Sequence, residues 1–519
     1  MSISRGPRAL KDEIVEKRVH DARDRFIASI SEAQVLRLAS SHHGGDECSF
    51  FQERARGSYN ICYFVQFRAT GDRWVVRIPL RPCLGTSVRD KVESEVNAMI
   101  LVASRTNIPV PKIHVHVTSD DPSPLSTFII LEYIGGEKLS YTRMRQLTAI
   151  EKEVLYSSLA DIYIQLRRLE FPSIGRLVHR HGDFHVGLKT SSIDFNMQQL
   201  EGLGTSSIQD GFLGHQGTLA SANKYVDMLL DITYNAFLRC RSSVVERGMG
   251  GQDLYHQHIF RNHVRERWID TTLDQGPFVL AHGDLEPFNL IVDDSMAVIS
   301  VLDWEWSRVV PVQFFNPPWW LCGLSTTRLA SKAVYDGYLA TFLHDFLQVV
   351  RAREQQRFGN ERLADEWHKS RDGGGFLISN ALENWTDIDW VASGYVARSL
   401  SPGQGHLSAR VAAYLKQDLL RAFVADVKER DGLAYCDELN RLVQETESEE
   451  QALAPVEELT TSKWIFTSLF TRLPWSTRAI PWPTRAISVT GLSKAAVIFA
   501  ATSLLIWRLM PDSLFRPRI

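Results

Sequence analysis

Hydrophobic residues in the first third of the chain follow a pattern that predicts β-strands. Residues 61–68 and 73–78 are rich in Val, Ile, Phe and Trp, and the turn Ala69–Asp72 separates them. Two such runs joined by a short glycine-containing turn are typical of a β-hairpin. The apolar run 128–133 ends at Gly135–Gly136, which predicts a buried strand followed by a linker.

A helix is predicted between these strands. Ser87 and Asp90 have the spacing of an N-terminal cap. The apolar residues that follow recur at helical spacing: Val92, Val96, Met99, Ile100 and Ala103. Residues 140–270 and 325–440 also have mainly helical patterns, apart from an irregular polar stretch at about 172–220. We therefore expect an α+β protein with a small antiparallel sheet followed by a larger, mainly helical part.

Composition excludes several classes of protein. The chain has 519 residues, of which 44% are hydrophobic and 23% charged, which excludes collagen-like, mostly disordered and polytopic membrane proteins. Lys and Arg total 58 against 61 Asp and Glu, so no net basic charge indicates nucleic-acid binding. The six cysteines form no CxxC pair, and the charged N-terminus has no apolar signal region. A reducing, cytoplasmic location is expected.

The segment Ala281–Trp306 contains the candidate catalytic and metal-binding residues. It contains His282, Asp284, Asn289 and Asp303 within a predicted series of strand, polar loop and hairpin. Phosphoryl transfer from ATP needs an oxygen acceptor to orient the attacking hydroxyl and oxygen ligands for Mg²⁺. Because antiparallel strands joined by a tight turn bring their ends together, the hairpin should return Asp303 beside Asn289.

HGDLEPFN followed by LDWE resembles the catalytic and metal loops of the aminoglycoside phosphotransferase family, which has a protein-kinase-like fold. The sequence segments FNPPWW, IPVP and EFPSIG resemble those of the fungal branch of that family. The resemblance covers roughly residues 55–330. It implies a two-lobed fold, with a small antiparallel-sheet N-lobe, a larger mainly helical C-lobe, and ATP and Mg²⁺ bound between them.

The resemblance also implies roles for individual positions. Asp284 resembles the catalytic base and His282 the structural histidine of the same loop, while Asn289 and Asp303 resemble the magnesium ligands. The nucleotide-binding positions would be Gly57 and Ser58 in a phosphate-covering loop, Arg77 on phosphate with Glu95 as its partner, and Leu131, Glu132 and Ile134 in the adenine-binding hinge. Arg77 stands where well-studied kinases have Lys, but Arg can also contact phosphate.

The interpretation divides the chain into five parts. An N-terminal helical extension occupies residues 1–50, the N-lobe 51–135 and the C-lobe 136–440. A linker at 441–490 precedes an apolar and basic segment at 491–519. Residues 486–510 could contact a membrane, because the apolar run 495–507 is flanked by arginines. That run alone is shorter than a bilayer core, but extension back to Ala486 gives 22 residues that include Lys494, so a single-pass and an interfacial anchor both stay open. A docked helix or a basic tail is the alternative.

Two motifs are not expected to form functional sites. His181-Gly182-Asp183 copies the HGD of the catalytic loop, but Leu188 stands where the asparagine would be required. His256, His258 and His263 are expected on a polar helix face rather than in a metal site, because residues two apart on a helix point in different directions.

The predicted function is ATP- and Mg-dependent phosphoryl transfer to a hydroxyl of a small molecule. The alternative is a catalytically weak, kinase-like nucleotide-binding scaffold, possibly associated with a membrane. Phosphorylation of proteins is disfavoured, because the chain has no recognisable activation segment ending in APE.

Overall fold

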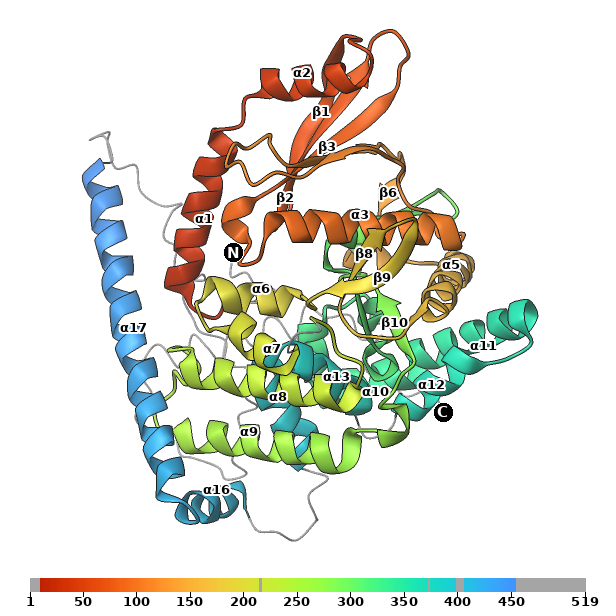
Figure 1. Cartoon of the computed structure of the whole chain (residues 1–519). Helices are drawn as coiled ribbons and strands as arrows, with labels where there is room; N and C mark the ends of the chain where they lie inside the picture. Colours follow the sequence, from red (N-terminus) through yellow and green to blue (C-terminus); the bar gives the residue numbers. More distant parts are fainter. Residues whose placement is uncertain (1–9, 214–216, 372–373, 398–405, 454–519) are drawn as a thin grey trace, which may run out of the picture. The chain divides into compact units, whose positions relative to one another are not determined.

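A computed structural model of the chain describes residues 10–213, 217–371, 374–397 and 406–453 (Figure 1). Two helices come first, α1 (Glu13–Ala28) and α2 (Glu32–His42). Asp12 caps α1 by accepting hydrogen bonds from the backbone N–H groups of Ile14 and Val15. The predicted helical extension is therefore present in the described part of residues 1–50.

An antiparallel sheet of five strands follows these helices. Its order is β1 (Cys48–Arg56), β2 (Asn60–Phe67), β3 (Arg73–Pro79), β5 (Phe128–Glu132) and β4 (Ile113–Val117). The predicted hairpin is confirmed as β2 and β3, and the predicted strand at 128–133 as β5. Strand β1 is not among the strands that the sequence predicted. It is an exposed edge strand with two register irregularities, so it lacks the hydrophobic alternation that would have revealed it.

Helix α3 (Val88–Arg105) is the helix predicted after Ser87. The Ser87 side chain accepts a hydrogen bond from the Asp90 backbone N–H over 3.3 Å, which confirms the cap. The predicted apolar face is right at its start and wrong at its end, because Ile100 and Ala103 are exposed while Leu101 and Val102 are buried. Two charged residues of α3, Lys91 and Glu95, are also buried.

The remaining described residues are mostly helical, as expected. Thr148 and Glu151 form a capping box at the start of α5. The long helix α17 runs beside α9 and α1, and the hydroxyl of Tyr435 on α17 accepts from the Glu13 backbone N–H over 2.8 Å (Figure 1). The helices are α4 (Tyr141–Met144), α5 (Ala149–Arg167), α6 (Ile193–Leu200), α7 (Thr205–Leu213), α8 (Ala222–Arg239), α9 (Gly250–His263), α10 (Lys332–Gly337), α11 (His344–Phe358), α12 (Arg362–Arg371), α13 (Gly375–Glu383), α14 (Ile388–Val391), α16 (Leu407–Lys416) and α17 (Leu419–Leu453).

Short strands connect these helices and frame the HGD motif. Strand β10 (Phe278–Ala281) lies between β13 (Arg308–Pro311) and β7 (Glu170–Phe171). Strand β11 (Leu290–Val292) lies between β12 (Val298–Val301) and β6 (Glu137–Lys138). The strands predicted within 278–302 are confirmed, including the hairpin that pairs Leu290 with Val301.

Two hydrophobic cores meet near residues 303–306. The smaller core joins the sheet to α2 and includes Tyr59 and Trp306. The larger core fills the helical part and includes Trp304. The short segment after Asp303 therefore anchors one indole in each core, and this fixes the segment relative to both.

The C-terminal boundaries need one correction. Helix α17 continues to Leu453, into the acidic stretch where a linker was predicted to begin at residue 441. Glutamate has good helix propensity, and no proline or glycine occurs between Gly432 and Pro455. Residues 454–519, with the predicted apolar and basic segment, lie outside the described residues. None of the described helices combines the length and the apolar character needed to cross a bilayer.

Candidate active site

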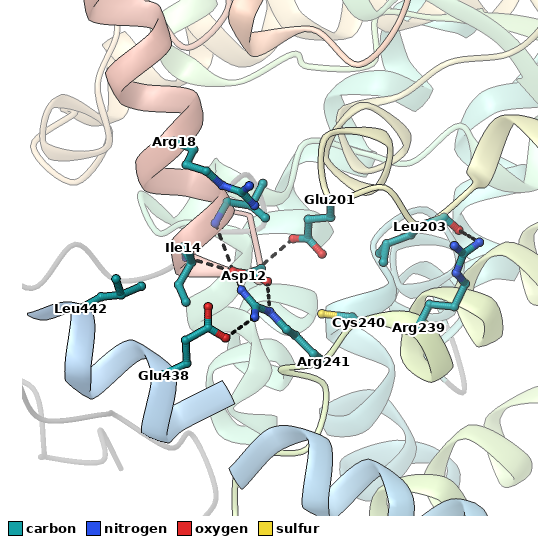
Figure 2. A pocket seen from close by; sticks show the side chains of 11 residues that line it. Asp12, Ile14, Arg18, Glu201, Leu203, Arg239, Cys240, Arg241, Glu438 and Leu442 are labelled. Carbon is teal, nitrogen blue, oxygen red and sulfur yellow. Dashed lines mark hydrogen bonds and ion pairs between the residues drawn. The ribbon is translucent and has the colours of Figure 1, made fainter. Parts of the chain in front are cut away.

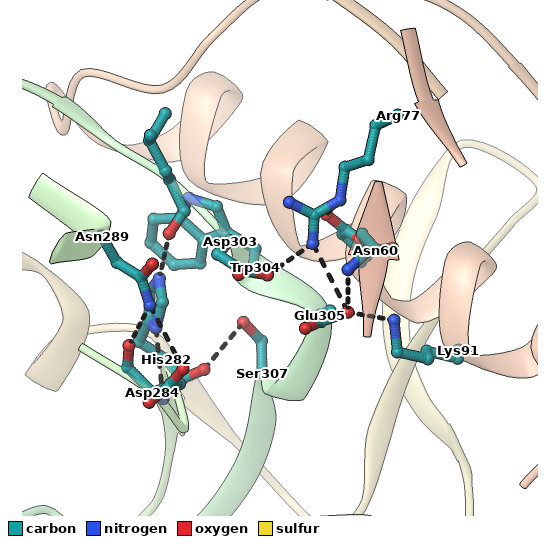
Figure 3. Close-up of polar contacts among 12 residues, drawn as sticks. Asn60, Arg77, Lys91, His282, Asp284, Asn289, Asp303, Trp304, Glu305 and Ser307 are labelled. Atoms are coloured by element: carbon teal, nitrogen blue, oxygen red, sulfur yellow. Dashed lines mark hydrogen bonds and ion pairs between the residues drawn. The ribbon is translucent and has the colours of Figure 1, made fainter. Parts of the chain in front are cut away.

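His282 organises the loop that follows β10. Its Nε2 lies 2.9 Å from the Leu302 carbonyl oxygen, and its Nδ1 lies 3.3 Å from the Asp284 backbone nitrogen (Figure 3). A carbonyl can only accept and a backbone N–H can only donate, so the ring is neutral with its proton on Nε2. The ring also packs against Trp304, with centroids 4.6 Å apart. His282 therefore ties the Asp284 loop to the end of the hairpin, as its predicted structural role requires.

Gly283 is required between His282 and Asp284. Its φ of +82° is in the left-handed region, and a Cβ atom would lie 2.1 Å from the Trp306 carbonyl oxygen. No larger residue fits without moving the backbone. The middle position of the HGD motif is thus set by close packing of two backbone segments.

Asn289 and Asp284 face one another within the same loop. Asn289 donates from Nδ2 to the Asp284 backbone oxygen over 2.7 Å and to Asp284 Oδ2 over 3.2 Å. Both bonds use the amide nitrogen, so Oδ1 is the Asn289 atom that could bind a metal. The loop is held further by Trp320, whose Nε1 donates to the Leu285 carbonyl oxygen over 2.6 Å.

The hairpin returns the chain to Asn289, as predicted. The Leu302 backbone N–H donates to the Asn289 carbonyl oxygen over 2.8 Å. Asp303 follows with φ 66° and ψ 57°, a left-handed conformation that is uncommon outside glycine but tolerated by aspartate. This local turn directs the Asp303 side chain toward β3 (Figure 3).

Arg77 of β3 meets carboxylates from two directions. Its Nε lies 3.3 Å from Glu95 Oε1, and its Nη2 donates to Asp303 Oδ1 over 2.5 Å. Nη2 is also 3.4 Å from Glu305 Oε2. The structure thus brings together Arg77, Glu95 and Asp303, three residues that the sequence analysis placed in one site.

Sequence reasoning missed three members of this cluster. Glu305 is buried and accepts a hydrogen bond from Asn60 Nδ2 over 2.6 Å. Lys91, also buried, forms an ion pair with Glu305. The available signals were the glutamate of LDWE and a lysine one helical turn before Glu95, a spacing that places both on one face of α3.

Burial and charge oppose each other in this cluster. Burial disfavours ionisation of Asp303, but the charge and hydrogen bond of Arg77, aided by Lys91, lower its pKa to about 2. Burial raises the pKa of Glu95 to about 7 despite Arg77 and Lys91. Burial and then the charge of Asp303 raise the pKa of Glu305. The cluster therefore has three carboxylates around two cations, Arg77 and Lys91. Asp303 is the carboxylate whose pKa is lowered, so it is the one that stays ionised to the lowest pH.

The predicted nucleotide-binding positions lie in different parts of the sheet region. Gly57 and Ser58 form the tight turn between β1 and β2, where the Gly57 N–H donates to the Asn60 carbonyl oxygen over 2.9 Å. Leu131 and Glu132 belong to β5, and the Glu132 N–H is already donated to the Lys112 carbonyl oxygen over 2.9 Å. Ile134, the third predicted hinge residue, lies beyond the end of β5.

The site's donor set fits Mg²⁺. Asn289 Oδ1 and the Asp303 carboxylate are hard oxygen ligands, which Mg²⁺ prefers over nitrogen and sulfur. About a quarter of the Asp303 side chain is exposed (26%), so an ion could reach it. Asp284 is partly exposed, as a group that meets a substrate hydroxyl must be.

The copied HGD motif lies in a different environment. His181 and Gly182 have φ of 55° and 83° and form the turn between β8 (Arg176–Arg180) and β9 (Asp183–Leu188). Asp183 pairs with Arg105 at the surface. The copied motif therefore lies in a surface hairpin, and its lack of a catalytic role stays a prediction.

The prediction for the histidines of α9 was wrong for His256. This residue is fully buried, and its Nδ1 lies 2.6 Å from Asp389 Oδ1. Potential ligand atoms of Asp253, His256 and Asp389 lie within 4.8 Å of one another. The contact that buries the His256 side chain is made by a residue of another helix, since Asp389 belongs to α14.

A cavity of about 600 Å³ lies elsewhere, beside α1, α8 and α17 (Figure 2). Three of its charged groups pair with one another, since Arg241 lies 2.6 Å from both Asp12 and Glu438. None of the site residues predicted from the sequence lines it.

The comparisons with known proteins give distant similarities. No protein-family model matches the chain. A subtelomeric hrmA-associated cluster protein of Aspergillus fumigatus is 26% identical over 135 residues, and its counterpart from another strain is 26% identical over 134 residues. Each match covers 26% of this chain and 26% of the relative, so it spans about a quarter of either protein.

The solved structures that the chain resembles are aminoglycoside and macrolide phosphotransferases. One is APH(2")-IIa in a ternary complex with streptomycin and ATP, with 16% identity, a TM-score of 0.34 and coverage of 55% of this chain and 73% of that one. Another is macrolide 2'-phosphotransferase type I, with 15% identity, a TM-score of 0.37 and coverage of 72% and 99%. These are the kinds of protein that the HGDLEPFN and LDWE motifs resemble, and the site residues themselves carry the functional inference.

Proposed function

We propose that the chain is a phosphotransferase that uses ATP and Mg²⁺ to phosphorylate a hydroxyl of a small molecule. The observation that supports the proposal is that Asn289 contacts Asp284 and that the hairpin returns to Asn289 at Leu302, one residue before Asp303, which Arg77 contacts. Phosphoryl transfer depends mainly on positioning and charge stabilisation, which such a set of groups can provide.

Asp284 would accept a hydrogen bond from the substrate hydroxyl and take its proton as the new bond forms. Asn289 Nδ2 already donates to Asp284 Oδ2, which helps to hold the carboxylate in one orientation. A base positioned in this way contributes about 10²–10⁴-fold to the rate.

Asn289 Oδ1 and the Asp303 carboxylate would hold the metal. When bound, Mg²⁺ offsets the charge that develops on the transferred phosphoryl group. Arg77 would contact phosphate while Glu95 keeps its guanidinium in place from the other side. The Gly57–Ser58 turn would cover the phosphates, and the backbone at Ile134 would meet adenine.

A boundary between the two lobes at residue 135, a cytoplasmic location and a small hydroxyl-bearing substrate belong to this same proposal. The lack of excess basic charge supports a small substrate rather than a nucleic acid.

The test is ATP turnover by the purified full chain across a panel of hydroxyl-bearing metabolites, with Asp284→Ala measured in parallel. We expect ADP release that requires one acceptor and Mg²⁺ and that is lost in Asp284→Ala. Folded wild-type protein that fails to bind Mg-ATP would overturn the proposal.

A further inference from the structure

A single carboxylate oxygen gathers contacts from three elements of the sheet region. Glu305 Oε2 accepts from Asn60 Nδ2 over 2.6 Å, forms an ion pair with Lys91, and lies 3.4 Å from Arg77 Nη2 (Figure 3). Asn60 begins β2, Lys91 belongs to α3, and Arg77 belongs to β3. Glu305 itself follows Asp303 by two residues.

Asn60 links this oxygen to the turn at residues 57–59. The Asn60 side chain binds Glu305, while its backbone oxygen accepts from the Gly57 N–H over 2.9 Å. One residue therefore closes the turn with its backbone and connects it to the Asp303 segment with its side chain.

Lys91 links the same oxygen to α3. Lys91 and Glu95 are one helical turn apart, and each pairs with a member of the cluster on the opposite side, Glu305 and Arg77 respectively. The two ion pairs therefore connect α3 directly to Glu305 and, through Arg77, to β3.

These contacts are too deeply buried to meet a substrate directly. Glu305 is 4% exposed, Lys91 1% and Asn60 6%. Aromatic packing surrounds them, since Tyr59 meets the Trp306 ring edge to face at 4.9 Å and Lys91 lies over the same ring at 5.6 Å. A buried pair of this kind holds geometry, and removing one partner leaves an uncompensated charge.

We propose that Glu305 is a positioning residue that couples the turn at residues 57–59 and helix α3 to the metal-binding position of Asp303. The inference rests on the proposed function and deepens it. Ordering of the turn over the nucleotide phosphates and placement of Asp303 then depend on one shared oxygen, although Glu305 touches neither nucleotide nor acceptor.

The experiment compares wild type, Glu305→Gln and the double variant Lys91→Met/Glu305→Gln. The double variant removes both charges together, so it leaves neither Lys91 nor Glu305 as an unpaired buried ion. Amide hydrogen exchange at residues 57–60 is measured without nucleotide, and calorimetry measures Mg-ATP affinity. We expect exchange at 57–60 to accelerate at least about tenfold in both variants and Mg-ATP affinity to fall by a similar factor, which corresponds to about 1.4 kcal/mol. KM for the acceptor should not change.

Glu366→Gln is the matched control for general destabilisation. It disrupts a partly buried pair, in which the buried Arg167 contacts the partly exposed Glu366 over 2.6 Å between α5 and α12. We expect Glu366→Gln to leave exchange at 57–60 and Mg-ATP affinity at wild-type values. Equal effects in this control and in Glu305→Gln would overturn the positioning role.

The readouts separate failure of this inference from failure of the proposed function. If wild type binds Mg-ATP but both Glu305 variants keep wild-type exchange and affinity, the inference falls and the function stands. If wild type does not bind Mg-ATP, the function falls. Exchange at 57–60 then still shows whether Glu305 orders the turn, and the coupling to metal binding falls with the function.

Discussion

Arg77 donates from Nη2 to Oδ1 of Asp303 over 2.5 Å. The residue proposed to contact phosphate therefore already holds the residue proposed to bind the metal. Asp303 stays ionised because the charge of Arg77 lowers its pKa to about 2, and burial alone would raise it. A carboxylate kept anionic in this way is ready to accept a divalent cation at any physiological pH.

The stability of the cluster should depend on Arg77. Arg77→Met leaves Glu95, Asp303 and Glu305 without their shared cation, so we expect a loss of about 3–5 kcal/mol in the free energy of unfolding by urea. Adding Glu95→Gln should recover part of this loss, because it removes one carboxylate. Arg89→Met, which breaks the exposed pair with Asp120, is the control and should change stability little. A similar loss in both single variants would contradict this account.

Catalysis should depend on the Asp of one HGD motif and not on that of its copy. Asp284→Asn should lower kcat by about 10²–10⁴-fold while Mg-ATP affinity changes little, because Asp284 acts on the acceptor hydroxyl. Asp183→Asn in the β8–β9 turn should leave kcat unchanged, since its partner Arg105 is at the surface. Steady-state kinetics and calorimetry measure the two quantities. Retained kcat in Asp284→Asn would exclude it as the base.

The two motifs also offer a matched pair of glycines. Gly283 and Gly182 have nearly the same φ, +82° and +83°, but a Cβ at Gly283 would collide with the Trp306 carbonyl, whereas a Cβ at Gly182 meets no atom within 4 Å. Gly182→Ala should cost about 1–2 kcal/mol from backbone strain alone. Gly283→Ala should cost clearly more and should also abolish turnover. Equal unfolding free energies for the two variants would argue against the close packing described around Gly283.

Stability should decrease as pH rises from about 4 to 8 because of Asp194. Burial raises its pKa to about 8, although a hydrogen bond from Gln198 opposes the shift. In this pH range the folded protein keeps the Asp194 proton and the unfolded chain loses it, so raising the pH favours unfolding. In Asp194→Asn the free energy of unfolding should decline less as the pH rises. The difference from wild type across the range should be on the order of a few kcal/mol. Urea unfolding at pH 5 and pH 8 measures it, and an unchanged slope in the variant would be the contrary result.

The sequence was informative where a local pattern determines structure. The hairpin of β2 and β3, the cap at Ser87 and the return of the chain from Asn289 to Leu302 all depend on neighbouring residues, and all were predicted. The contact between Arg77 and Glu95 followed from the resemblance.

The sequence was less informative where tertiary packing determines structure. Strand β1 has no alternating pattern because it is an exposed edge. Lys91 looks like an ordinary surface lysine until α3 turns it toward Glu305, a residue 214 positions later in the chain. Burial of His256 likewise depends on Asp389 in another helix. Charged residues buried through long-range pairs leave no periodic signal.

The most direct test of the proposed function is calorimetric titration of the full-length protein with ATP, in the presence and absence of Mg²⁺. The account predicts saturable binding at one site that requires Mg²⁺ and is lost in Asp303→Asn, while Asp284→Asn still binds. Folded wild-type protein that shows no binding heat with Mg-ATP, or binding that Asp303→Asn does not weaken, would contradict it.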